Sequence, residues 1–135
     1  MSNIDNTYNP KATPMNPINL FYAKILQYFT FAGIKAINVH AQASFIFSAT
    51  LYFYFLEVVQ LFTGEASVFI QLMILAIGPM MHLISYSYFN SAAMASKLSD
   101  IIENESAQTN AISSLLTVAF ILPMIIFFTI TVFAV

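Results

Sequence analysis

The residues able to do chemistry are few, and they lie inside long apolar stretches of the chain. Polar and ionisable groups inside a membrane span cost free energy unless they are paired, so each is a candidate for function. A carboxylate could carry a proton or hold a cation, amides could bond across a helix contact, and a histidine could ligate a haem. The candidates are Glu57, Gln60, Gln71 and His82, together with the small residues Ser48, Gly78 and Ser85.

No catalytic motif accompanies these residues. The sequence has no HExxH, CxxC, P-loop or GxGxxG pattern, and no Ser-His-Asp set. It has no Cys, which removes thiolate nucleophiles, thiolate metal sites and disulfides. It has no Arg and only four Lys, too few and too scattered for a phosphate-binding patch. We therefore predict neither an enzyme acting alone nor a nucleic-acid partner.

The composition indicates a membrane protein. Hydrophobic residues make up 59% of the 135 residues, and charged residues only 7%, where about 25% is usual in soluble domains. A soluble domain of this size has a large share of its residues at the surface, and this sequence lacks the polar side chains to cover one. Membrane lipid is therefore the first expected partner.

The elements that must position the candidates follow from the hydropathy pattern. We expect an all-α integral membrane helical bundle: three transmembrane helices preceded by an amphipathic helix at the interface or packed against the others. Asn16 and Pro17 are typical of a helix start. Residues 91–110 are polar, and their first half is expected to continue the second span. The predicted ranges are a polar N-terminal arm over 1–16, then a single domain over 17–135 with the amphipathic helix at 17–39 and spans at 41–63, 67–90 and 111–135.

The lysines predict the orientation of the chain in the membrane. Lys11, Lys24 and Lys35 precede the first span, and Lys97 lies between the second and third. Because lysines favour the cytoplasmic side, the N-terminus is expected on the cytoplasmic or matrix side. The sequence does not identify which membrane this is.

A short turn at 64–66 makes the first two spans an antiparallel hairpin and sets the level of each residue. Gln60 is then level with Ile70, beside Gln71, and Glu57 lies one turn deeper. Glu57, Gln60 and Gln71 could form a hydrogen-bonded cluster that holds the hairpin together. The alternatives for Glu57 are a proton- or ion-binding carboxylate and a contact with another subunit.

His82 is expected level with Ser48, too far along the hairpin to pair with Glu57. At helical spacing it lies on a stripe of mostly small residues, which favours close helix contact with neutral His82 bonded to a serine or a carbonyl. Cofactor ligation and proton handling are the alternatives. His40 falls at another level, so a haem at His82 would need a ligand from a partner chain, and we predict no cofactor for this chain alone. The stripe comprises Gly78, His82, Ser85, Phe89, Ala92 and Ser96.

Two tyrosines and two prolines also need partners inside the spans. Tyr52 and Tyr54 lie deep in the first span, where a buried hydroxyl requires an acceptor. Pro79 and Pro123 interrupt the backbone bonding of the second and third spans, which is tolerated when neighbouring groups bond the freed backbone.

These features favour a small, non-catalytic subunit with a structural or assembly role in a larger membrane complex, alongside other subunits or copies of itself. A haem- or quinone-associated anchor of a respiratory complex is the first alternative. Its outline of an N-terminal arm and three spans, with a histidine in the second, resembles the layout of the membrane anchors of succinate dehydrogenase, without motifs of that family. A self-assembling hydrophobic coat or filament protein is the second alternative.

Overall fold

The first helix, α1 (Pro17–Phe31), begins where the sequence predicts and ends earlier. The computed structural model describes residues 16–33, 36–63 and 68–133, so the arm before Asn16 and the turn at 64–66 lie outside the described residues. Asn16 Oδ1 accepts the backbone N–H of Ile18 at 2.9 Å, and Pro17 occupies the start of the helix. The prediction of one helix over 17–39 is wrong, because Gly33 adopts a φ of 76°, a left-handed conformation typical of helix ends.

Three further helices are long and apolar enough to cross a membrane, as predicted. They are α2 (Ala36–Thr63), α3 (Val68–Phe89) and α5 (Ala107–Phe133). Both α2 and α5 begin a few residues before their predicted starts. Every described element is a helix, so the all-α fold class is confirmed.

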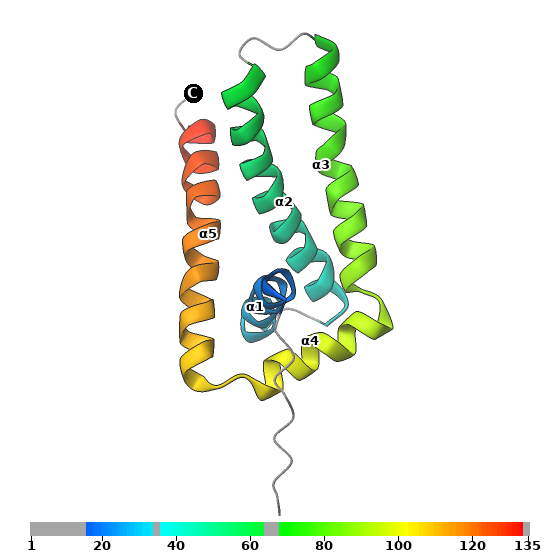
Figure 1. The fold of residues 1–135 in the computed structure, drawn as a ribbon, viewed down its shortest axis with the longest axis vertical. Helices are drawn as coiled ribbons and strands as arrows, with labels where there is room; N and C mark the ends of the chain where they lie inside the picture. Colours follow the sequence, from blue (N-terminus) through cyan, green and yellow to red (C-terminus); the bar gives the residue numbers. More distant parts are fainter. Residues whose placement is uncertain (1–15, 34–35, 64–67, 134–135) are drawn as a thin grey trace, which may run out of the picture.

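The three spans lie side by side as one layer, with α2 between α3 and α5 (Figure 1). Two tyrosines on opposite sides of α2 bond this layer together. Tyr52 donates to the carbonyl of Ile74 on α3 at 3.0 Å, and Tyr54 donates to the carbonyl of Phe120 on α5 at 2.9 Å. Both accepting carbonyls lie within about a turn and a half before a helix-interior proline, Pro79 or Pro123. The tyrosines therefore have the acceptors that their depth requires.

The polar segment after α3 does not continue that helix, and this prediction is wrong. The chain turns at Asn90 and Ser91 and enters α4 (Ala92–Asn104), which runs across the lower ends of the spans (Figure 1). The reason is that α4 is amphipathic: Met94 and Leu98 are buried on one side, while Asp100 on the other is exposed. Ala92 and Ser96 consequently leave the predicted stripe.

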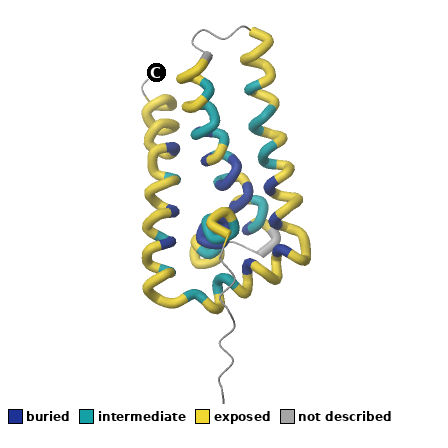
Figure 2. Tube along the Cα trace, viewed as in Figure 1, coloured by how far each residue is buried: buried dark blue, intermediate teal, exposed yellow. Residues whose placement is uncertain are grey.

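α1 passes between α2 and α5, above α4, and is seen nearly end-on in Figure 1. Its buried residues are consecutive, from Tyr22 to Ile25, and not spaced along one face. A helix buries four consecutive positions only when neighbours surround it, and α1 contacts α2, α4 and α5. Figure 2 shows this buried turn at the centre of the bundle's lower half. Of the two predicted placements, packing against the other helices is therefore the one observed.

Aromatic rings hold the middle of α1 in place. The Tyr22 ring stacks on Phe89 at the end of α3, with centroids 3.7 Å apart and an interplanar angle of 3°. Phe47 of α2 meets both rings edge-on, at 5.7 Å from Tyr22 and 5.2 Å from Phe89. Such pairs add about 0.5–1.5 kcal/mol each beyond the area they bury. One aromatic cluster thus joins α1, α2 and α3.

Candidate functional site

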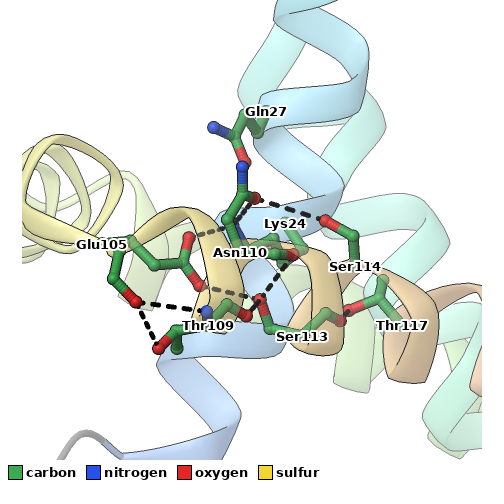
Figure 3. Close-up of polar contacts among 9 residues, drawn as sticks. Lys24, Gln27, Glu105, Thr109, Asn110, Ser113, Ser114 and Thr117 are labelled. Carbon is green, nitrogen blue, oxygen red and sulfur yellow. Dashed lines mark hydrogen bonds and ion pairs between the residues drawn. The ribbon is translucent and has the colours of Figure 1, made fainter.

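The most concentrated polar cluster in the described structure lies where α1 meets the start of α5 (Figure 3). Its centre is Lys24, whose side chain is 1% exposed although it sits in the apolar run FYAKIL. The Lys24 ammonium forms an ion pair with Glu105, whose side chain is 2% exposed. We call the set Lys24, Gln27, Glu105, Asn110 and Ser113 the α1 clasp.

Local structure explains why Glu105 can reach α1. α4 ends at Asn104, and Glu105 is extended, with φ −75° and ψ 129°, before α5 begins at Ala107. This short link turns the chain from α4 into α5 beneath α1. Ser113, two turns into α5, donates to Glu105 Oε1 at 2.7 Å. The carboxylate is therefore held from both α1 and α5.

The ammonium of Lys24 has a partner for each of its three hydrogens. Besides Glu105, it donates to Asn110 Oδ1 at 2.6 Å and to Gln27 Oε1 at 3.1 Å. A lysine ammonium has three donors and no acceptor, so its bonding capacity is complete. The charges of Lys24 and Glu105 cancel, and every hydrogen of the ammonium is already bonded. The α1 clasp is therefore better suited to holding α1 in place than to moving protons or ions.

The energetics of a buried ion pair support that interpretation. Desolvation offsets much of the Coulomb attraction, so such a pair adds little net stability over a well-packed apolar pair. Removing one partner is different, because it leaves a buried charge without compensation and costs about 3–5 kcal/mol. The α1 clasp therefore specifies where α1 sits more than it adds stability.

Tyr22 provides a second polar link from α1. Its hydroxyl lies 3.3 Å from His40 Nδ1 and donates to the His40 carbonyl at 3.3 Å. Burial raises the pKa of the Tyr22 phenol, and the nearby Tyr86 contributes in the same direction. The phenol is therefore a neutral donor at ordinary pH.

The predicted level of His82 is confirmed. Its Nδ1 lies 3.5 Å from the Ser48 hydroxyl, which also donates to the Phe45 carbonyl at 3.0 Å. One turn further along the hairpin, a side chain at Gly78 would meet the Tyr52 ring at 3.4 Å. Ser85 is buried on the same stripe. Small residues thus let α3 approach α2 closely, as predicted for the seam.

His82 also borders a groove between α2 and the end of α1. The groove has a volume of about 510 Å³, and Phe45 and Asn38 are among its lining residues. The Phe45 ring meets the imidazole edge-on at 5.8 Å. His82 is partly exposed here, so cofactor ligation by His82 stays a prediction.

The polar residues near the hairpin end are at exposed positions. Glu57, Gln60 and Gln71 are all exposed. Gln71 has an interaction of its own. The predicted hydrogen-bonded cluster of these three residues stays a prediction, as does a role for Glu57 toward another subunit.

Lys24 and Glu105 were not predicted as site residues. The only sign in the sequence that Lys24 is special is that it is a lone lysine in an apolar helix. Such a lysine is equally typical of a helix at the membrane interface, where the ammonium reaches water. Glu105 lies in the polar run ENES, far away in the sequence, and no spacing links it to Lys24. Only the passage of α1 between the spans brings them together.

Within the residues that the structure describes, no three His, Asp or Glu side chains are grouped as metal ligands would be. Comparison of the chain with family models, curated proteins and solved structures finds no match.

Proposed function

We propose that the protein is a small, non-catalytic subunit with a structural or assembly role in a larger membrane protein complex. The observation that carries this proposal is how little the spans bury one another. In the most apolar window of α3, 0% of the residues are buried, and in that of α5 only 11% are. A single layer of three helices leaves both edges and both faces available to other membrane helices.

The polar interior supports the same role. The α1 clasp has its ammonium fully bonded, and the Ser48–His82 contact lies in a seam between helices. Groups used in this way fix the helices relative to one another. A rigid layer with open edges suits a subunit that positions its neighbours.

Site-directed cross-linking in native membranes tests this proposal. The chain has no cysteine, so each introduced cysteine is a unique reporter. Leu75→Cys and Leu83→Cys lie on the exposed face of α3, where the wild-type side chains are 67% and 64% exposed. Ser85→Cys, on the buried face, is the matched control. We expect a benzophenone maleimide attached to the cysteine at the exposed positions, and not at the control, to cross-link the chain on illumination to a different protein of defined mass, because benzophenone inserts into C–H bonds of any neighbour.

The same experiment distinguishes the alternative assemblies. Products of twice the chain's mass, recovered in particles without detergent, would instead indicate a self-assembling coat or filament protein. Absence of any product at exposed positions of both α3 and α5 would contradict the subunit proposal.

A haem- or quinone-associated anchor is a second candidate, favoured by the position of His82 at the edge of a groove. In that case a partner chain would supply the second ligand of a haem. The purified complex would then show a visible absorption band that His82→Ala removes. A colourless complex that binds no quinone would exclude this candidate.

The orientation of the layer is also a proposal. Lys24 and Lys97 both lie at the end of the layer that α4 crosses, and we propose that this end faces the cytoplasm or matrix. Ser99→Cys on the exposed side of α4 should resist a membrane-impermeant maleimide in intact cells or organelles and react after permeabilisation. Reaction before permeabilisation would reverse the orientation.

A further inference from the structure

A groove that is polar at one end and apolar along the rest runs between α1 and α5. Its polar end, with a volume of about 230 Å³, is lined by Lys24, Gln27, Asn110 and Ser114. Its apolar part, about 290 Å³, has Ile25, Val118 and Leu122 among its lining residues. Tyr28 lines both parts, so the two lie next to each other along α1 and α5.

One stripe of α5 forms the wall of this groove. Its residues recur at helical spacing and change from polar to apolar away from α4: Asn110, Ser114, Val118, Leu122 and Ile125. From Ser114 to Ile125 the stripe covers about 16 Å at 1.5 Å per residue. That is close to half of a hydrocarbon core about 30 Å thick, the depth of one lipid leaflet.

The polar end lies near the start of the α5 span, where we expect the membrane surface. Asn110 is near the start of the α5 span, next to α4, and Figure 3 shows it beside Gln27 and Ser114. Tyr28 and Phe31 flank this end and are 46% and 94% exposed, as expected of aromatic residues at the interface. The groove is therefore polar where a phospholipid has its headgroup and apolar where it has its acyl chains, in the same order from the membrane surface inward.

We propose that this groove binds one phospholipid molecule, with an acyl chain along Val118, Leu122 and Ile125 and the phosphate–glycerol region at the polar end. The amide groups of Gln27 and Asn110 still have N–H donors, because Lys24 uses only their oxygens.

The headgroup preference follows from the charge of the polar end. Glu105 neutralises Lys24, so the site attracts no anion by net charge. The affinities for phosphatidylethanolamine and phosphatidylglycerol are therefore expected to lie within about threefold of each other. Both lipids have a phosphate, which would accept hydrogen bonds from the amide N–H groups of Gln27 and Asn110.

Native mass spectrometry of the full chain tests the proposal. The protein is reconstituted with 1-palmitoyl-2-oleoyl phosphatidylethanolamine or phosphatidylglycerol and released from detergent micelles. Val118→Trp fills the groove, and Ser114→Leu removes polarity at the headgroup end. Leu115→Trp, 71% exposed on the same helix and not lining the groove, is the matched control.

We expect one phospholipid to stay bound to the wild type and to Leu115→Trp, and at least a tenfold lower bound fraction for Val118→Trp. Ser114→Leu is a smaller change than Val118→Trp and should also lower the bound fraction of phospholipid. The test therefore does not depend on the folding of the tryptophan variant alone. Equal retention by all four chains would overturn the proposal. Retention of an isoprenoid quinone from native membranes in place of phospholipid would overturn the assigned occupant.

Discussion

The replacement Lys24→Met tests the α1 clasp most sharply. Methionine keeps the length and apolar stem of the side chain but removes the ammonium, which leaves the carboxylate of Glu105, 2% exposed, with the Ser113 hydroxyl as its main partner. The side-chain oxygens of Gln27 and Asn110 lose a donor as well. Loss of one partner of a buried pair predicts a decrease of about 3–5 kcal/mol in the free energy of unfolding.

The assay is an SDS titration of the protein in mild detergent, followed by thiol labelling of a single cysteine. Ser44→Cys places that cysteine at a position that is 0% exposed in the folded chain, so labelling reports the unfolded fraction. Lys97→Met, on the exposed side of α4, is the matched control and should change stability by less than about 0.5 kcal/mol.

A double-mutant cycle with Glu105→Gln separates the ion pair from its surroundings. Lys24→Met combined with Glu105→Gln should be less destabilised than the sum of the single variants, by about 1–3 kcal/mol, because the second change removes the uncompensated charge. If Lys24→Met matched Lys97→Met, or if the two single effects were additive, the reasoning about the α1 clasp would be refuted.

Two further predictions concern contacts between the helices and a third concerns the end of α1, each measured by the same SDS titration. Tyr52→Phe and Tyr54→Phe each remove a hydrogen bond to a carbonyl and should cost about 0.5–1.5 kcal/mol, whereas Tyr88→Phe, half exposed, should have no effect. No loss in either of the first two would contradict the bonding of the layer by α2. Gly78→Leu should cost about 1–3 kcal/mol by displacing the Tyr52 ring, and a neutral result would disprove the close α2–α3 approach. Gly33→Ala should cost about 1–2 kcal/mol because of the positive φ, and unchanged stability would show that α1 ends differently.

Much of the layer could be predicted from the sequence because the bilayer dictates it. Long apolar segments of about 20 residues become spans whatever their neighbours, since every backbone group must be bonded within the helix. The short connection between the first two spans also fixed their register. The contact between Ser48 and His82 therefore followed from counting residues along two helices of known rise.

The lower half of the bundle could not be predicted in the same way. Whether a mildly polar helix such as α1 lies on the membrane or passes between the spans depends on partners distant in sequence. The ion pair of Lys24 with Glu105 and the stacking of Tyr22 on Phe89 decide this, and neither leaves a local pattern. The direction of α4 depends in turn on the position of α1, because the buried residues of α4, Met94 and Leu98, belong to the same core as Tyr22 of α1.

The mass of the particle that contains this chain in its native membrane is the decisive test of the proposed structural role. Gentle extraction, affinity capture through an added tag and native mass measurement would give that mass and the identity of each component. The proposed role predicts a particle of fixed stoichiometry that contains this chain together with other membrane proteins. A particle that contains only this chain and lipid, as a monomer or as copies of itself, would contradict it.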